Sequence, residues 1–330
     1  MGLAAFISPG KDLPTAVARV QKAEELGYDA VLATQTMGRD GLTVLAAYAA
    51  GTSRIKLGTG VQPCFPRHPL AMAIEAATLD ELSGGRLILG IGPSHQLTME
   101  SFYGIKMERP LVRMREYVEI LRSVFTTGAV NFDGEFYHAQ FTFMGYKARP
   151  DIPIYIAAMA PGMLKLCGEK CDGDVLWACL PSFIRESVAP RIHATASAAG
   201  RDPSSVNIIA AIPTALTTNR EAALDIFRRE FFVYMTLPFY RRSIAGAGYE
   251  GELKAFDEAQ AAGDFAGQTA AISDRMLDEF AAVGDEKLIA DKYAEYRDAG
   301  VTTPGVGLFS AGDGFAGIEA TMEAVKRVAG

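Results

Sequence analysis

The sequence predicts an α/β fold, a (β/α)8 TIM barrel, and three observations support this prediction. Short apolar runs alternate with segments of helical periodicity along most of the chain. The run Leu87–Ile91 is apolar or glycine at every position, which is typical of a strand buried on both faces of a parallel sheet. Eight predominantly apolar runs are predicted as strands, and eight strands alternating with helices favour a closed barrel over an open doubly wound sheet.

The predicted strands and helices follow one another in the order of βα units. The strands are predicted at 3–7, 29–34, 55–60, 86–92, 152–158, 174–178, 207–216 and 301–308. The helices are predicted at 14–26, 69–82, 110–125, 162–171, 183–199, 220–235 and 285–299.

Three segments do not fit a minimal barrel. Residues 96–109 form a long loop after the fourth strand, and residues 130–150 alternate like a hairpin around Asp133-Gly134. Residues 239–283 are the largest insertion, with a glycine-rich run followed by alanine-rich helical sequence. Long excursions of this kind are usually lids or interface elements. We expect one barrel domain over residues 1–330 that carries these insertions, because α/β barrels often exceed the usual length of one domain.

Composition indicates an enzyme with a large core and excludes some classes of partner. The chain has 330 residues, of which 49% are hydrophobic, and a formal net charge of −7. This charge disfavours a nucleic-acid or anionic-membrane surface, which needs a concentrated basic footprint. No apolar window approaches the roughly 18 residues of a membrane span. We therefore expect a cytoplasmic protein that binds a small-molecule substrate, with no nucleic-acid or membrane partner.

The four cysteines are predicted to be buried thiols. They lie in apolar contexts without C-x-x-C spacing, so neither a metal site nor a disulfide framework is indicated. They are Cys64, Cys167, Cys171 and Cys179.

The most informative stretch runs from Thr78 to His95. A helix stops at Gly84-Gly85, where a positive φ is favoured, and a buried strand then opens onto a glycine-rich loop. Barrel enzymes place their chemistry on the loops after the carboxyl ends of their strands, so His95 becomes a candidate site residue. The motif residues at the opposite end of the strand are interpreted as structural; they are Asp80, Ser83 and Arg86.

The run from Thr78 to Gly92 resembles the luciferase-like monooxygenase superfamily, in which a helix ending in L-D-x-L-S-x-G-R precedes a strand ending in L-G-x-G. Further similarities cover almost the whole chain, at 23–29, 58–61, 67–69 and 152–177. Among the subgroups, G-I-G-P-S-H at 90–95 and the overall length are most similar to the oxidoreductases that use the deazaflavin coenzyme F420.

The resemblance implies two cofactor-binding loops. After Thr59, a non-prolyl cis peptide at Gly60-Val61 would form a backstop under the central deazaflavin ring; a plain turn is the alternative. After the strand at 152–156, free N–H groups at a helix start would hold the cofactor phosphate, although an ordinary proline-initiated helix has the same sequence. The further residues implied in cofactor binding are Thr34, Gly92, Pro93, Ser94, Ala158, Met159, Ala160, Pro161, Gly162 and Met163.

Two polar residues are the catalytic candidates. Related deazaflavin enzymes have an acidic proton donor near His95, and histidine titrates close enough to neutral pH to supply that proton; the alternative is a loop histidine that bonds the backbone. Several relatives have an acid beside a histidine where this chain has Gln35, which can hydrogen-bond a ring edge or a carbonyl but is no ordinary acid or base. This favours reduction of a C=C or C=N bond over alcohol oxidation.

Other polar and aromatic residues have structural and functional interpretations. Arg67 and His68 are expected to cap or brace the helix that starts at Pro69. Arg241 and Arg242 could meet the anionic oligoglutamate tail of the cofactor or a substrate carboxylate, or form a solvated pair. Trp177 either walls the pocket or belongs to the core.

The hypothesis is therefore an F420-dependent oxidoreductase that transfers hydride between C5 of the cofactor and a small organic substrate. The resemblance also implies a homodimer. Two alternatives remain: an FMN-dependent monooxygenase that uses reduced flavin and O2, and a non-catalytic barrel that binds a flavin or deazaflavin.

Overall fold

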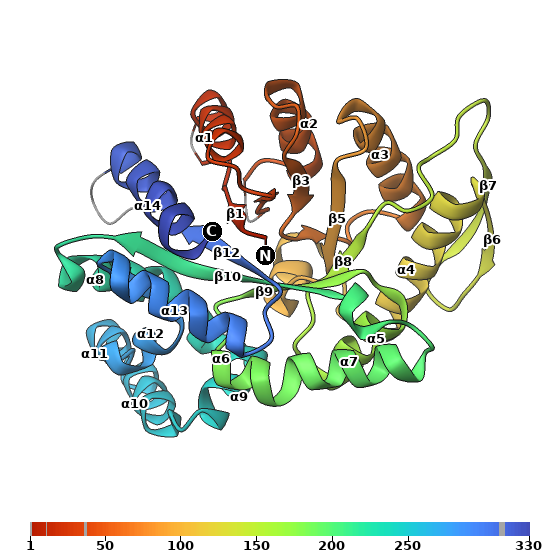
Figure 1. Ribbon diagram of the computed structural model, residues 1–330. Helices are drawn as coiled ribbons and strands as arrows, with labels where there is room; N and C mark the ends of the chain where they lie inside the picture. The colour runs from red at the N-terminus through yellow and green to blue at the C-terminus, as the bar shows by residue number, and fades with distance from the viewer. Residues whose placement is uncertain (1, 11, 36–37, 310–313) are drawn as a thin grey trace. The chain divides into compact units, whose positions relative to one another are not determined.

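Figure 1 presents the computed structural model, which describes residues 2–10, 12–35, 38–309 and 314–330. Strands and helices alternate in the order of a (β/α)8 barrel, so the predicted fold class is confirmed. The chain divides into two compact units, and the expectation of a single domain stays a prediction. The amino-terminal unit consists of Phe6–Val175 and Arg191–Asn207; the carboxyl-terminal unit consists of the residues up to Ala5, Leu176–Pro190 and Ile208–Gly330.

The amino-terminal unit is built on parallel strands that follow the predicted positions. Its sheet order is β2 (Ala30–Ala33), β3 (Lys56–Thr59), β5 (Leu87–Gly92), β8 (Ile154–Ile156) and the start of β9 (Gly173–Trp177). Beyond the end of β3, the short strand β4 (Gln62–Pro63) pairs with the last residues of β5. Because all these strands are parallel, their carboxyl ends meet at one edge.

Successive helices pack against one another beside these strands, as α1 to α4 do in Figure 1. The helices are α1 (Leu13–Glu25), α2 (Gly41–Gly51), α3 (Pro69–Leu82), α4 (Pro110–Thr127) and α5 (Pro161–Lys170). Helix α2 is absent from the predicted set because it is apolar on nearly all sides and lacks the polar stripe that marks a surface helix. The hairpin expected in residues 130–150 is confirmed as β6 (Ala129–Asp133) and β7 (His138–Thr142).

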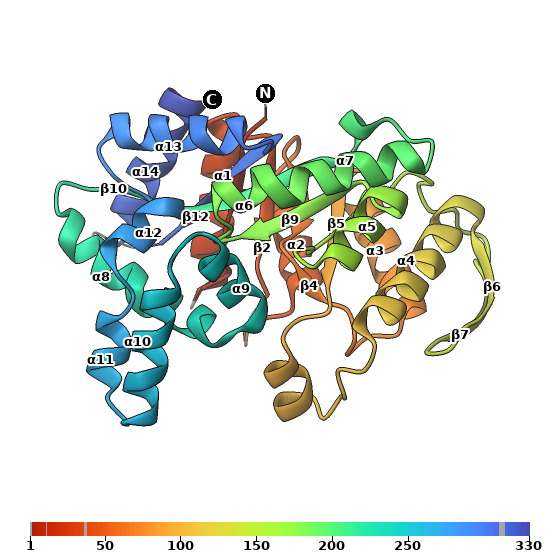
Figure 2. The ribbon, with the colours of Figure 1, turned by 90° about the horizontal axis from the view of Figure 1, so that it is seen from below.

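The carboxyl-terminal unit contains the remaining parallel strands. These are β10 (Asn207–Leu216), β11 (Ala282–Gly284) and β12 (Thr303–Leu308), with β10 between the other two and β1 (Ala4–Phe6) next to β12. Its helices include α8 (Arg220–Phe231), α13 (Glu286–Asp298) and α14 (Gly314–Ala329). Helices α13 and α14 pack against each other, as both views of the ribbon show (Figures 1 and 2).

Two helix predictions need correction. The segment 183–199 is not one regular helix but α6 (Pro181–Phe183), a π-helical turn over Ile184–Val188, and α7 (Ala189–Ala198). Pro190 lacks the N–H that would continue an α-helical ladder there. The segment 220–235 leaves the α-helix after Phe231 and ends at Leu237, which is extended because it precedes Pro238.

The insertion at 239–283 is largely helical, as predicted for its alanine-rich part. It contains α9 (Pro238–Gly246), α10 (Glu250–Ala261), α11 (Phe265–Ala270) and α12 (Asp274–Phe280). Figure 2 shows α10 and α11 side by side. The proposed role of this insertion as a lid stays a prediction.

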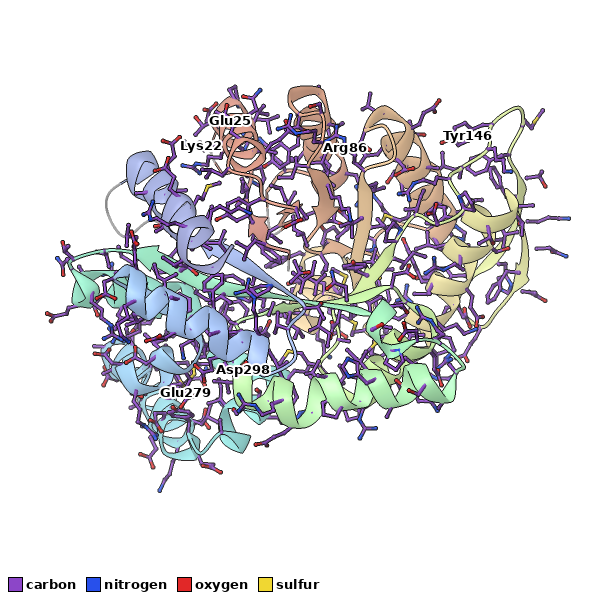
Figure 3. The ribbon with its side chains drawn as sticks, in the orientation of Figure 1. Lys22, Glu25, Arg86, Tyr146, Glu279 and Asp298 are labelled. Carbon is purple, nitrogen blue, oxygen red and sulfur yellow. The ribbon has the colours of Figure 1, made fainter. Side chains whose placement is uncertain are left out.

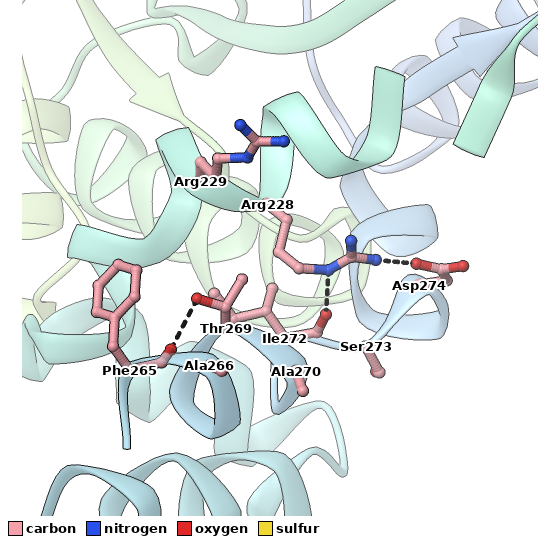
Figure 4. Close-up of a pocket in the computed structure, with 9 residues that line it drawn as sticks. All are labelled: Arg228, Arg229, Phe265, Ala266, Thr269, Ala270, Ile272, Ser273 and Asp274. Atoms are coloured by element: carbon pink, nitrogen blue, oxygen red, sulfur yellow. Dashed lines mark hydrogen bonds and ion pairs between the residues drawn. The ribbon is translucent and has the colours of Figure 1, made fainter. Parts of the chain in front are cut away.

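A cavity of about 610 Å³ lies where the insertion packs on α8 (Figure 4). The guanidinium of Arg228 lies at this cavity, donates to the carbonyl of Ile272 at 2.8 Å, and forms ion pairs with Asp225 and Asp274. The positive charge of Arg228 is therefore already neutralised within the unit. The lining residues are Arg228, Arg229, Phe265, Ala266, Thr269, Ala270, Ile272, Ser273 and Asp274.

The motif at the amino-terminal end of β5 has the structural role expected of it. Gly84 and Gly85 have φ of +71° and +80°, the left-handed conformation that ends α3. The buried carboxylate of Asp80 accepts two hydrogen bonds of 2.9 Å from Arg149. Arg86, labelled in Figure 3, donates to the carbonyl of Ile55 at 2.9 Å.

Two further sequence expectations concern the core and the membrane. All four cysteines are buried free thiols, as predicted, and burial raises the pKa of Cys171 to about 12. Among the helices of the described residues, none is both long enough and apolar enough to cross a membrane.

Candidate active site

Backbone hydrogen bonds join the carboxyl ends of four neighbouring strands in the amino-terminal unit. The Gly60 N–H donates to Ala33 at the end of β2 (2.8 Å), and the Ala157 N–H donates to Ile91 of β5 (3.0 Å). The loops after β2, β4, β5 and β8 therefore share one edge of the sheet. These loops and strand ends carry most of the predicted site residues: Thr34, Gln35, Thr59, Gly60, Val61, Gly92, Pro93, Ser94, His95 and Ala158 to Met163.

The peptide bond between Gly60 and Val61 is cis, as the family resemblance implied. A side chain at Gly60 is excluded by packing, since an added Cβ would lie 2.8 Å from the Phe6 ring and 3.0 Å from Leu32. The buried hydroxyl of Thr59 donates to the carbonyl of Gly90 at 2.5 Å and accepts from its N–H at 3.0 Å. This side chain thus joins β3 to β5, and a contact of Thr59 with a cofactor would use its backbone.

Two glycines of β5 allow the neighbouring backbone to come close. A Cβ on Gly90 would lie 2.0 Å from the carbonyl oxygen of Thr59, a backbone atom. A Cβ on Gly92 would lie 2.9 Å from Cγ2 of Val61 and 3.3 Å from Cβ of Ala157. Neighbouring protein atoms already occupy the space that a side chain at either position would need. This favours glycine at the end of β5 beside the cis peptide.

The loop after β5 turns sharply before the catalytic candidate. Ser94 has φ of +66°, an unusual conformation for a residue with a side chain and one that is concentrated at functional sites. The carbonyl of His95 accepts from the Met99 N–H at 2.9 Å, just before the π-helical turn Thr98–Phe102. His95 is exposed as a residue, yet nearby protein partly desolvates its imidazole and lowers its pKa. His95 is consequently neutral at pH 7.

Gln35 has a structural bond that the sequence did not suggest. Its Oε1 accepts from the N–H of Gly41 at 2.8 Å, the first residue of α2. The N-cap of the same helix is Asp40, which accepts from Thr43 at 2.9 Å. Gln35 thus holds the start of α2 with its oxygen, and its Nε2 group is the part that a ligand can use.

A cavity of about 370 Å³ adjoins Gln35. Within it, Arg67 forms ion pairs with Asp40 and, at 3.1 Å, with Glu75, so a single positive charge is shared between two carboxylates. Partial burial favours the neutral acid at Asp40, but hydrogen bonds from Thr43 and the Arg67 charge lower its pKa overall. The cavity is lined by Gln35, Gly38, Asp40, Pro63, Pro66, Arg67 and Tyr103.

The structural interpretation of Arg67 and His68 is confirmed. Arg67 connects the N-cap of α2 to Glu75 of α3 through its two ion pairs. His68 is the N-cap of α3, and its Nδ1 accepts from the Leu70 N–H at 3.2 Å.

The start of α5 has the features of an anion site. Its N-cap, Ala160, has no side chain that caps the helix, and the first turn contains no acidic residue. The first helical bond runs from the Leu164 N–H to Ala160 at 2.9 Å, so the N–H groups of Gly162 and Met163 have no acceptor inside the helix. These donors and the helix dipole favour a bound anion.

Two buried polar residues at this edge were not among the predicted site residues. Gln62 is fully buried in β4, and neither atom of its amide has a hydrogen-bond partner among the described residues. Asp174 is fully buried in β9, where its Oδ1 accepts from the Ala158 N–H at 2.9 Å. A polar residue inside an apolar strand was the only sequence signal for either of them.

Three predicted ligand residues belong to the carboxyl-terminal unit. The Trp177 ring lies 6.3 Å from that of Tyr234. Arg241 is bound at 2.6 Å to Asp257, and Arg242 lies over the Phe239 ring at 4.5 Å. Arg241 is thus half-buried and paired within the insertion, whereas Arg242 is exposed, and a ligand-binding role for either arginine stays a prediction.

Comparisons with known proteins agree with this geometry. The family model of luciferase-like monooxygenases matches residues 2–303. A 5,10-methylenetetrahydromethanopterin reductase from Archaeoglobus fulgidus is 32% identical over 288 residues, which is 86% of each chain. The same enzyme from Methanolobus tindarius is 33% identical over 284 residues, covering 85% of this chain and 86% of that protein.

A solved structure extends the similarity to the fold. The coenzyme F420-dependent tetrahydromethanopterin reductase from Methanopyrus kandleri superposes with a TM-score of 0.83 at 27% identity. The match covers 99% of this chain and 97% of that one. From the family model, the relatives and this superposition together, the chain belongs to the luciferase-like monooxygenase family.

Proposed function

We propose that this protein is a coenzyme F420-dependent oxidoreductase that transfers hydride between C5 of the cofactor and a small organic substrate. The observation that carries the proposal is the uncapped start of α5 beside the glycine-lined end of β5. The similarity of the chain to reductases, one of them described as F420-dependent, supports this choice of cofactor.

The residues present fit a cofactor with a planar ring and a phosphate. The N–H groups of Gly162 and Met163 would hold the phosphate, because no acidic side chain in the first turn of α5 competes for them. Gly60 and Val61 would support the ring at the strand edge, where the absence of a side chain at Gly92 lets Val61 pack against β5. When bound, the deazaflavin supplies the carbon that gives or takes the hydride.

His95 would provide the proton that accompanies reduction of the substrate. It follows the strained Ser94 on the loop after β5, at the same sheet edge as the proposed cofactor loops. Because its pKa is lowered, only a minor fraction is protonated at pH 7, and proton donation is favoured as pH falls.

Reduction of a C=N or C=C bond fits this site better than oxidation of an alcohol. Alcohol oxidation needs a base for the hydroxyl proton; Gln35 is not one, and Asp40, which lines the same cavity, is paired with Arg67, so neutral His95 is left as the base that an oxidation would use. The Nε2 group of Gln35 would orient a polar acceptor of the substrate.

The first experiment is a pair of fluorescence titrations of the purified chain, with coenzyme F420 and with FMN. We expect tight binding of F420 and weak binding of FMN. A preference for FMN would support the monooxygenase alternative, and failure to bind either would contradict the assignment.

Variants at Pro161, the exposed first residue of α5, locate the phosphate in the same titration. Pro161→Asp adds a carboxylate to the first turn of α5, where it favours the helix but repels an anion. We expect this variant to fold normally and to bind F420 more weakly by about tenfold or more, as for a charge of typical helix-terminus strength. Pro161→Ala is the matched control and should bind like the parent protein.

We further propose that the protein acts in the cytoplasm, as its composition led us to expect, and that it forms a homodimer, as the family resemblance implied. Sedimentation velocity of the purified chain, with and without F420, tests the dimer. A monomer in both conditions would contradict it.

A further inference from the structure

Asp174 is a buried carboxyl group directly behind the loop that leads into α5. In the sheet register Asp174 lies opposite Ile156 of β8. Ile156 is two residues before Ala158 in the chain. The Oδ1 of Asp174 accepts from the Ala158 N–H at 2.9 Å. Its Oδ2 is buried and has no hydrogen-bond partner among the residues that the structure describes.

Such a residue is costly in a strand of a barrel core. An unpartnered buried polar atom destabilises a fold by roughly 1–3 kcal/mol, and an apolar residue of similar size avoids this cost. The groups that oppose the effect of burial on Asp174 are N–H groups, of Ala158 and Val175, rather than a cation. Stability therefore does not account for this carboxyl group, whereas its bond to Ala158 gives it a definite place behind the loop.

The raised pKa of Asp174 suits a position near an anion. Burial raises the pKa of its carboxyl group well above the ordinary value, which favours the neutral acid over the carboxylate. A neutral acid still offers Oδ1 as an acceptor to the loop, but it adds no negative charge behind the N–H groups at the start of α5. An ionised carboxylate in this place would oppose phosphate binding.

We propose that Asp174 is a positioning residue for the cofactor phosphate. Its bond to Ala158 fixes the first residues of the loop, so that the N–H groups of Gly162 and Met163 are already oriented when the phosphate arrives. This inference rests on the proposed function, because it assumes that the start of α5 holds a phosphate.

The experiment compares a ligand that carries a phosphate with one that lacks it. The full-length protein is titrated with F420 and with the same deazaflavin chromophore without its phosphate and tail. Asp174→Leu removes the acceptor of the Ala158 N–H while keeping a similar shape; Asp174→Asn keeps the acceptor and is neutral at every pH. Asp174→Val is a second apolar variant, because β-branched residues are well tolerated in strands.

We expect the apolar variants to bind F420 about tenfold more weakly, the scale of one lost hydrogen bond, and to bind the phosphate-free chromophore normally. Asp174→Asn should restore F420 binding to within about threefold of the parent protein. An equal loss for both ligands, or no loss for either, would overturn the inference.

Asp172 supplies a matched control. It is two residues away, and its carboxylate is paired at 2.6 Å with Arg122 and accepts from the Ile154 N–H at the opposite end of β8. Asp172→Asn should lower the thermal stability without changing the ratio of the two affinities. A similar change of ratio in this variant would show a general effect of stability.

The failure of this inference is distinguishable from failure of the proposed function. Binding of F420 by the parent protein tests the function, and the ratio of affinities in the variants tests Asp174. If the parent protein binds FMN instead, the same contrast is measured with FMN and riboflavin. If the parent protein binds the phosphate-containing ligand of each pair no more tightly than the phosphate-free one, the role of Asp174 is rejected as well.

Discussion

The polar groups at the two ends of β5 differ in whether they have hydrogen-bond partners. At the amino-terminal end, Asp80 and Arg86 are surrounded by partners, with the Asp80 carboxylate bound to Arg149 and to the Leu87 N–H. At the carboxyl end, backbone donors at the start of α5 lack intrahelical acceptors, and Gln62 lacks partners among the described residues. A network in which each polar group has a hydrogen-bond partner stabilises a fold, whereas buried polar groups without a partner indicate a place for a ligand or water.

The largest expected effect breaks the network at the amino-terminal end. Asp80→Ala removes the buried carboxylate partner of the half-buried Arg149 and the acceptor of the Leu87 N–H, which should lower the free energy of unfolding by about 4 kcal/mol. Urea denaturation measures this change.

The matched control for Asp80 is Asp151→Ala. Asp151 also pairs with Arg149, at 3.3 Å, but its side chain is 79% exposed. We expect no measurable change of stability in this variant. Equal losses in the two variants would mean that burial does not decide the strength of the pair.

The next prediction compares two glycines of β5. Gly90→Ala would place a Cβ 2.0 Å from the Thr59 carbonyl oxygen, which cannot rotate away, so we expect a loss of about 3 kcal/mol in stability. The Cβ of Gly92→Ala would meet side chains rather than backbone, with Val61 at 2.9 Å and Ala157 at 3.3 Å. It should remain within about 1 kcal/mol of the parent protein but bind F420 more weakly, because Val61 must move. The reverse order of stabilities would contradict this difference between the two positions.

The third prediction concerns His95. His95→Ala should lower kcat by about 100-fold and leave the affinity for F420 unchanged, since the loss is confined to proton transfer. Steady-state kinetics and the fluorescence titration measure the two quantities. Gln96→Ala, at the exposed neighbouring position, is the control and should keep the parent kcat.

The pH profile sharpens the assignment of His95. Desolvation disfavours the charged imidazolium, so the folded protein holds that proton only below the ordinary histidine pKa of about 6.5. If protonated His95 is the donor, kcat falls as pH rises through the lowered pKa, and this limb is missing in His95→Ala. An identical limb in both proteins would remove His95 from the mechanism.

The smallest expected effect is at Gln35. Gln35→Leu removes the acceptor of the Gly41 N–H and should cost about 1 kcal/mol of stability, as loss of a helix cap does. Gln35→Glu keeps an acceptor and should preserve the cap. If Gln35 also orients the substrate through Nε2, both variants raise KM, and thermal unfolding separates the two roles. A normal KM in both would limit Gln35 to the cap.

Local sequence is enough to place most elements of this barrel. Helix α3 lies at Pro69–Leu82, as predicted, because Pro69 is suited to a helix start and Gly84-Gly85 to the turn that ends it. Helix α2 was not predicted, since a helix buried on nearly all sides has no amphipathic period. The break at Ile184–Val188 was also missed, although Pro190 was visible in the sequence.

Local sequence did not predict the hydrogen-bond partners of individual site residues. The glycine-rich loop and the helix start near Pro161 were found because φ preferences and free N–H groups belong to a few consecutive residues. The oxygen of Gln35 is taken by Gly41, and the Thr59 hydroxyl by Gly90, through contacts that side-chain type alone does not specify.

Asp174 illustrates the physical reason. The sequence shows a carboxylate in an apolar run, which is compatible with a surface position or an error in the predicted strand. Only the parallel register of β8 and β9 brings it behind Ala158, and only burial in the packed unit raises its pKa. Turns, caps and strand periodicity depend on neighbours in the chain, whereas hydrogen-bond partners and charge states depend on which strands pack together.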